Sequence, residues 1–221
     1  MKPGKTVHVV FFGDSICVGQ RISPHKSWVH KISERLANEA EANCFEVVVS
    51  NASVNGDTTR LALERMPFCV QSHPCDLIVI QFGMNDCNLW KTDNGLPRVT
   101  PRAFEANLHE IADRAKACGA RKIFIHTNQP TDKFVVMPPS NTRYQDNNRA
   151  YNEIIRNVAS GRDDLIFTDI ESQIETRLAE LGQTPAYITL PDLIHLNEKG
   201  HELYFEITCP SISGAVMELA R

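Results

Sequence analysis

Short runs of consecutive apolar residues recur along the chain. They alternate with longer stretches in which apolar residues return every third or fourth position. The runs predict five strands, at residues 6–12, 46–50, 77–82, 122–127 and 165–168. Continuous apolar runs are typical of strands that are buried on both faces of a parallel sheet.

The stretches between the runs have the period of amphipathic helices. Their apolar stripes begin at Trp28, Phe104, Tyr151 and Ile170. A further helix is expected from about Asn197, with an interruption at Pro210, because proline lacks the N–H that a helix interior needs. Strands that alternate with helices form parallel βαβ units, so we expect the α/β class and a three-layer α/β/α sandwich.

Composition is that of one ordinary globular domain, which we place at residues 1–221, without repeat or linker. The net charge of −4 predicts no binding of nucleic acid or of an anionic membrane. Neither a transmembrane stretch nor a signal-peptide core is evident, and seven irregularly spaced cysteines are typical of reduced thiols. We therefore expect a cytoplasmic protein.

Polar residues follow the predicted strands where each one ends. Ser15 comes after the first strand, residues 51–56 after the second and residues 83–86 after the third. Asp192 and His195 precede the last helix. In open parallel sheets, ligands bind outside the carboxyl ends of the strands, so all these segments are expected on one rim of the sheet.

Four of these segments carry recognisable motifs. They are Gly-Asp-Ser-Ile at 13–16, Gly56, Gly-Met-Asn-Asp at 83–86 and Asp-Leu-Ile-His at 192–195. In this order, the chain resembles the SGNH hydrolase superfamily, the GDSL esterases and lipases, with isoleucine in place of the family's fourth residue, leucine. The resemblance implies a flavodoxin-like sandwich around a five-stranded parallel sheet.

Serine, histidine and aspartate are the parts of a nucleophilic triad. A serine hydroxyl needs an adjacent base, for which His195 is the candidate, and Asp192 can orient the imidazole from the same loop. The resemblance further implies an oxyanion hole made by the backbone N–H groups of Ser15 and Gly56 and the side-chain amide of Asn85. These donors would stabilise the charge of a tetrahedral intermediate.

Each assignment has a structural alternative. Ser15 could cap the next helix, Gly56 could be a turn glycine, and Asn85 could be a helix cap. Asp192 and His195 could form a surface pair. We interpret Asp14 and Asp86 as structural residues. His8 and His126 lie within or at the end of predicted strands and are interpreted as core or rim residues.

Neither a metal nor a cofactor is expected. The chain has no His-Glu-x-x-His motif, no dinucleotide-binding glycine pattern and no phosphate loop. His201 does not suit a metal site, and Cys17 is a weak rival to Ser15 because it lies inside the next segment. A flavodoxin-like sheet could bind a nucleotide or flavin at its switch point, but the 192–195 motif has no role in that interpretation.

The expected reaction is acyl transfer to water, from a small-molecule ester with a short acyl group such as acetyl. An acyltransferase with the same triad, and a non-catalytic nucleotide- or sugar-binding protein, remain alternatives. The site wall is expected from the 129–142 loop and from Ile16, Val54, Met84, Leu89 and Trp90. Arg98, Lys133 and Arg143 could contact an anionic or sugar alcohol, or could simply be solvated.

Overall fold

The computed structural model describes residues 5–221 and contains one five-stranded sheet. The strand order is β2-β1-β3-β4-β5, and every neighbouring pair is parallel. The strands are β1 (Thr6–Gly13), β2 (Glu46–Asn51), β3 (Leu77–Gln81), β4 (Lys122–His126) and β5 (Leu165–Thr168). Each observed strand agrees with its prediction to within one residue at either end.

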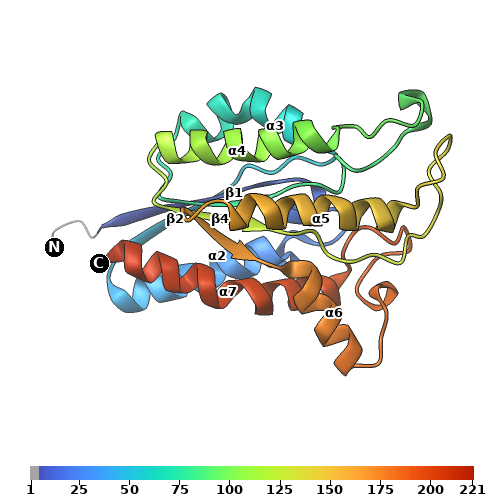
Figure 1. Cartoon of the computed structure of the whole chain (residues 1–221). Coiled ribbons are helices and arrows are strands. Elements are labelled where there is room, and N and C mark those ends of the chain that lie inside the picture. Colours follow the sequence, from blue (N-terminus) through green and yellow to red (C-terminus); the bar gives the residue numbers. More distant parts are fainter. Residues whose placement is uncertain (1–4) are drawn as a thin grey trace.

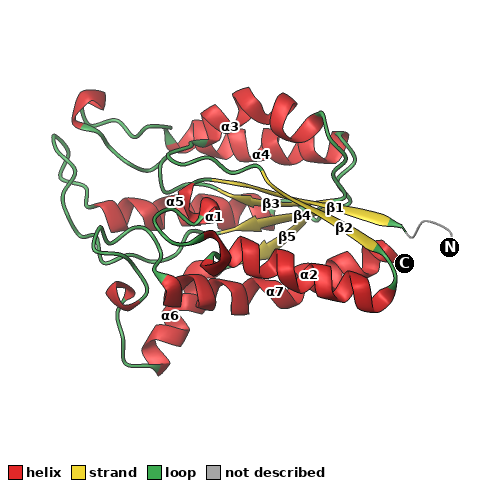
Figure 2. Ribbon diagram, turned by 180° about the vertical axis from the view of Figure 1, so that it is seen from behind, coloured by secondary structure: helices red, strands yellow, loops and turns green. Residues whose placement is uncertain are grey.

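Helices cover both faces of the sheet, so the predicted three-layer α/β/α class is confirmed (Figures 1 and 2). One layer contains α3, α4 and α5, and the other contains α2 and α7, with α6 beside α7. The helices are α1 (Ser15–Val18), α2 (Trp28–Asn43), α3 (Thr59–Met66), α4 (Pro101–Ala117), α5 (Tyr144–Ser160), α6 (Ile170–Glu180) and α7 (Glu198–Ala220).

The apolar runs are continuous because both faces of the inner strands are buried. Phe11 and Phe12 are neighbours on β1 and both are fully buried. Phe11 packs edge-to-face on Trp28 of α2, whereas Phe12 packs edge-to-face on Phe82, after β3. Successive side chains of a strand point to opposite faces, so the core extends over both sides of β1.

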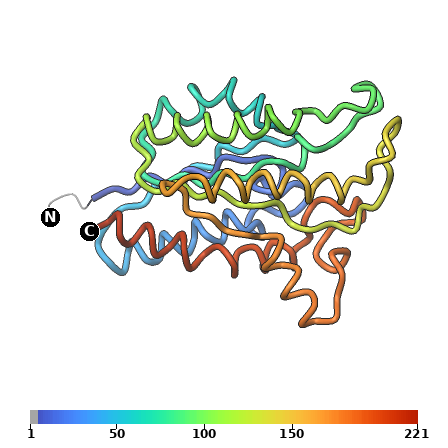
Figure 3. Tube along the Cα trace, viewed as in Figure 1, coloured from blue at the N-terminus to red at the C-terminus, as the bar shows by residue number. Residues whose placement is uncertain are grey.

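The strand order sets the position of a possible site. β1 lies between β2 and β3, so the chain leaves β1 toward one edge of the sheet and later returns on its other side. Open α/β sheets bind ligands at such a switch point, beyond the carboxyl ends of the strands. In Figure 3 the long connections after β3 and β4 extend at the end of the molecule opposite the two termini.

Helix α3 was not predicted from the sequence. It is short, and the residues it buries, Thr59, Ala62 and Met66, include one polar side chain. With so few apolar residues on its buried face, α3 has no clear helical period in the sequence, where charged residues surround them. Its clearest signal is Thr58, whose hydroxyl accepts the backbone N–H of Leu61 as a helix N-cap.

The predicted interruption at Pro210 is wrong. α7 continues through this proline to Ala220. Proline at this position leaves the carbonyl of Glu206 without its helical donor, but both residues are exposed, so water can take the place of the missing donor. Within residues 5–221, none of the helices has the length and apolarity needed to cross a bilayer.

Candidate functional site

Ser15 lies at the carboxyl end of β1, in the tight turn that the sequence predicts. The alternative in which Ser15 caps the helix is wrong: Asp14 is the N-cap of α1, and its carboxylate accepts the backbone N–H of Ile16 at 2.9 Å. Gly13 is required by close packing, because a Cβ there would lie 2.7 Å from the carbonyl oxygen of Gln81. The turn thus holds the serine with little freedom.

His195 joins Ser15 to Asp192 by hydrogen bonds. Its Nδ1 lies 2.7 Å from Oδ2 of Asp192, and its Nε2 lies 3.0 Å from Oγ of Ser15. A carboxylate only accepts hydrogen bonds, so Nδ1 carries the proton and Nε2 is free to accept from the serine hydroxyl. The three side chains therefore form one chain of hydrogen bonds, although Ser15 and His195 are 180 residues apart in the sequence.

The loop between Asp192 and His195 is closed on itself. Oδ1 of Asp192 accepts the backbone N–H groups of Ile194 and His195 at 3.0 and 2.9 Å. Leu193 takes a left-handed conformation with φ of 59°, which bends the backbone enough for the two side chains to meet. Gln129 donates to the Ile194 carbonyl and ties this loop to the connection after β4.

Asp192 is set up to stay ionised. Partial burial opposes ionisation, but hydrogen bonds from the His195 ring and from the backbone of Ile194 and His195 outweigh it and lower the pKa of Asp192 to about 2. The carboxylate is therefore charged throughout the neutral range. Its charge favours a proton on the adjacent imidazole when one is transferred from Ser15.

Asn85 connects the Ser15 turn with the loop that carries Gly56. Its side-chain amide donates to the carbonyl of Asp57 at 2.9 Å and to Oδ2 of Asp14 at 3.3 Å. Gly56 has φ of 77°, a conformation that glycine adopts without strain. Within residues 5–221, the backbone N–H groups of Ser15 and Gly56 have no acceptor. The three predicted oxyanion donors thus lie on adjoining segments.

A buried group of polar residues supports this arrangement, and most of it was not predicted. Arg65 pairs with Asp57 and also donates to the backbone carbonyl of Ala52. Asp86 accepts both the backbone N–H and the hydroxyl of Thr59 at the start of α3, which agrees with its predicted structural role. The Asp-Thr-Thr sequence after Gly56 is typical of a helix start and was the available signal.

Asp14 is the most perturbed carboxyl group of the site. Burial raises its pKa to about 7, the Ile16 N–H opposes this rise, and the nearby Asp86 and Asp57 add to it. A raised pKa means that the folded protein binds a proton which the unfolded chain releases near its ordinary value, 3.8. Asp14 therefore stabilises the fold at low pH, and this contribution is lost as the pH rises toward 7.

We expect this effect to disappear in Asp14→Asn. The free energy of unfolding of the wild type, relative to that of the variant, should fall by a few kcal/mol between about pH 4.5 and about pH 8. Urea unfolding of both proteins at the two pH values measures the difference. Equal pH dependence in the two proteins would mean that Asp14 titrates near its ordinary value.

The predicted site wall is partly wrong. Ile16, Met84 and Leu89 are at most 8% exposed and belong to the hydrophobic core. Val54 and Trp90 are exposed, and the guanidinium of Arg98 lies 3.7 Å from the centre of the Trp90 ring.

The basic residues that could contact an anionic or sugar alcohol have partners of their own. Arg143 pairs with Asp146 on α5. Lys133 lies over the ring of Tyr144, and burial lowers its pKa although the nearby Asp192 opposes this.

Other titratable groups lie in the core. Cys17 is fully buried and its thiol contacts Gln81, so it is not exposed beside Ser15. His126 contacts the Tyr204 hydroxyl, and burial lowers its pKa to about 3. His201 accepts the Trp28 backbone N–H, and burial lowers its pKa to about 4. All seven cysteines are free thiols, and within residues 5–221 no three His, Cys, Asp or Glu side chains are grouped to hold a metal.

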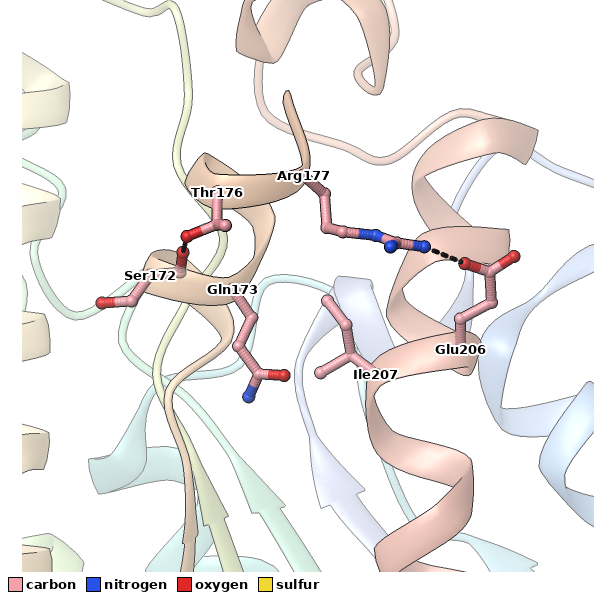
Figure 4. Close-up of a pocket in the computed structure, with 6 residues that line it drawn as sticks. All are labelled: Ser172, Gln173, Thr176, Arg177, Glu206 and Ile207. Carbon is pink, nitrogen blue, oxygen red and sulfur yellow. Dashed lines mark hydrogen bonds and ion pairs between the residues drawn. The ribbon is translucent and has the colours of Figure 1, made fainter. Parts of the chain in front are cut away.

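A separate hollow of about 470 Å³ lies between α6 and α7 (Figure 4). The Arg177 side chain crosses it to Glu206, at 3.2 Å, and the Thr176 hydroxyl donates back to its own helix at Ser172. It contains none of the Ser15, His195 or Asp192 side chains. The chemistry described above therefore belongs to the strand ends and not to this hollow.

The chain is similar to known esterases in sequence. The profile of the GDSL-like lipase/acylhydrolase family matches residues 11–203. An arylesterase from Vibrio mimicus is 29% identical over 122 residues, 55% of this chain and 55% of the relative. Esterase TesA from Pseudomonas aeruginosa is 31% identical over 118 residues, 53% of each. The chain thus spans about half the length of these curated relatives.

Solved structures share the fold over nearly the whole chain. Axe2, an acetylxylan esterase from Geobacillus stearothermophilus, has a TM-score of 0.74 at 20% identity over 96% of both chains. LAE5, an α/β hydrolase from the metagenome of Lake Arreo, has a TM-score of 0.75 at 19% identity, covering 96% of this chain and 97% of its own. Identity this low shows the fold alone. Because the family profile spans most of the chain, and the four motifs occur in order, the protein belongs to the GDSL-like lipase/acylhydrolase family, as its sequence motifs predict.

Proposed function

We propose that this protein is a serine esterase that hydrolyses a carboxylic ester of a small molecule through an acyl-enzyme on Ser15. The observation that carries the proposal is the position of the His195 ring, with one nitrogen 3.0 Å from the Ser15 hydroxyl and the other 2.7 Å from the Asp192 carboxylate. Family membership and the similarity to two esterases support the same reaction.

The first half-reaction acylates the serine. His195 Nε2 takes the proton of the Ser15 hydroxyl while Oγ bonds to the ester carbonyl carbon. The imidazolium, stabilised by Asp192, then gives that proton to the leaving alcohol as the C–O bond of the ester breaks. In the second half, His195 takes a proton from water, the hydroxide adds to the acyl carbon, and Ser15 leaves with the proton.

The developing oxyanion would be met by three donors. The unengaged N–H groups of Ser15 and Gly56 can donate directly. The Asn85 amide uses both of its hydrogens in the free protein, so the oxyanion would take the place of Asp14 at the longer, 3.3 Å contact. Because Asp14 is fully buried, the amide would turn from this carboxylate toward the substrate to donate to the oxyanion, while its bond to Asp57 could remain.

Replacing Asn85 with alanine should lower kcat by roughly 10²- to 10³-fold, the usual cost of one oxyanion donor. KM should change little, because the bond is strongest in the transition state. Steady-state kinetics measures both constants, and Asn107→Ala, which removes an amide bound to Thr59, is a matched control. A wild-type rate in Asn85→Ala would remove Asn85 from the oxyanion hole.

Short acyl groups, acetyl first, are the proposed substrates. Three of the apolar side chains predicted for the site wall, Ile16, Met84 and Leu89, are packed into the core, so they leave little apolar surface for a long chain. Because an acetylxylan esterase shares this fold, acetylated sugars are the second group of substrates to test. We also propose one catalytic domain over residues 1–221, and the cytoplasmic location stays a prediction.

Hydrolysis of p-nitrophenyl acetate tests the function, with a burst of p-nitrophenol expected if the acyl-enzyme accumulates. A series of longer acyl chains should give falling kcat/KM. Product analysis with an added alcohol separates hydrolysis from acyl transfer to that alcohol. A folded protein that turns over none of these esters and binds a sugar or nucleotide instead would overturn the proposal.

A further inference from the structure

Arg21, which the sequence did not single out, contacts Asp192 of the Ser15–His195–Asp192 group. Its Nη1 donates to Oδ2 of Asp192 at 2.8 Å, and this is the same oxygen that lies 2.7 Å from Nδ1 of His195. Oδ1 of Asp192 is taken by two backbone N–H groups. The imidazole and the guanidinium therefore share one carboxylate oxygen.

The backbone brings Arg21 to this place from the turn that carries the nucleophile. α1 ends at Val18, and the N–H groups of the next two residues, Gly19 and Gln20, both donate to the carbonyl of Ser15. Arg21 follows with φ of 70°, a left-handed conformation that is unfavourable for a side chain other than glycine or asparagine. The contact with Asp192 thus joins the Ser15 turn directly to the His195 loop.

The charges around His195 come from several elements. Asp192 is on its own loop, Arg21 follows α1, and Lys133 in the connection after β4 is close enough to Asp192 to be influenced by its charge. His201 on α7 is influenced by His195 and is kept neutral by burial. Among these groups, the Arg21 guanidinium is the cation that contacts the Asp192 carboxylate directly in addition to the imidazole.

A second cation on Oδ2 weakens the attraction between Asp192 and a protonated imidazole. Two positive groups that share one acceptor also repel each other. The neutral imidazole, which is the form that can take a proton from Ser15, loses less by this sharing. The Arg21 side chain is 58% exposed, so the effect is reduced by solvent.

Resting on the proposed esterase function, we propose that Arg21 is a positioning residue that acts through Asp192. It holds the 192–195 loop against the Ser15 turn, and its guanidinium competes with the imidazole for the same oxygen of Asp192, so its removal should strengthen the attraction between Asp192 and a protonated imidazole. It does not touch the reacting atoms.

The pH profile of kcat/KM for p-nitrophenyl acetate tests this role, because its acid limb reports the base of the free enzyme. In Arg21→Met the acid limb should move to higher pH by roughly half a unit, less than for a buried pair because of the exposure. Arg21→Lys should restore most of the shift. High salt should move the wild-type limb toward that of Arg21→Met.

Arg35→Met is the matched control, since Arg35 is 60% exposed and pairs with Glu39 on α2. Its profile should superimpose on that of the wild type. The rate of Ser15 labelling by a fluorophosphonate, measured over the same pH range, gives a second readout that needs no turnover.

Two outcomes would overturn the inference while leaving the esterase function in place. In the first, the acid limb of Arg21→Met lies at the same pH as that of the wild type, even if kcat/KM is lower at every pH. In the second, the acid limb of the wild type does not move when the salt concentration is raised. If Arg21→Met does not fold, the salt response and Arg21→Lys decide. A wild type with neither ester turnover nor fluorophosphonate labelling would overturn the proposed function, and this inference with it.

Discussion

Ser15→Ala is expected to lose nearly all ester turnover, by a factor of up to ~10⁶. Alanine removes the atom that bonds to the acyl carbon, and Cys17, the nearest alternative nucleophile in sequence, is fully buried with its thiol directed at Gln81. What rate remains would come from the oxyanion donors and from substrate binding alone.

His195→Ala should lose a similar factor, because a serine hydroxyl without its base is a poor nucleophile. The double variant should be little worse than either single one, since the residues act as a unit. Initial rates with p-nitrophenyl acetate measure these losses. Ser172→Ala on α6 and His30→Ala on α2 serve as controls and should keep the wild-type rate. Either site variant with more than a few per cent of that rate, once its fold is verified by thermal unfolding, would refute its assignment.

Asp192→Asn is expected to have the second largest effect, a loss of ~10⁴ in kcat without loss of the fold. The amide oxygen can still accept the backbone N–H groups of Ile194 and His195, so the loop can keep its shape. The amide nitrogen, however, would face Nδ1 of His195 and donate to it. The imidazole proton would then reside on Nε2, which could no longer accept the proton of Ser15.

This loss should not be recovered by raising the pH, because the amide holds the wrong tautomer at any pH. Asp164→Asn is a suitable control, since Asp164 is an ion-paired aspartate that lies outside the site. A fall in rate of less than tenfold in Asp192→Asn would show that Asp192 does not select the tautomer.

The strands and the positions of the site segments could be predicted because they depend on local patterns. Runs such as the one ending at Phe12 require burial on both sides, and the parallel topology then places Ser15 and Asn85 beyond the ends of neighbouring strands. The contact between Ser15 and His195 follows from the same topology, since the last loop lies beyond the rim of the sheet.

Contacts between side chains of distant segments could not be predicted in this way. Arg21 is a surface arginine by sequence, and only the left-handed turn after Gly19 directs it to Asp192. The pairing of Arg65 with Asp57 likewise depends on where α3 lies. The interruption predicted at Pro210 is wrong because the rule that proline breaks a helix ignores tertiary packing. Here the proline is exposed and α7 continues through it.

The most direct test of the central claim, that Ser15 is an activated nucleophile, is peptide mapping by mass spectrometry after treatment with a fluorophosphonate. The expected result is a single adduct on the peptide that contains Ser15 in the wild type, and almost none in His195→Ala under the same conditions. An adduct on another residue, or equal labelling of Ser15 with and without His195, would contradict it.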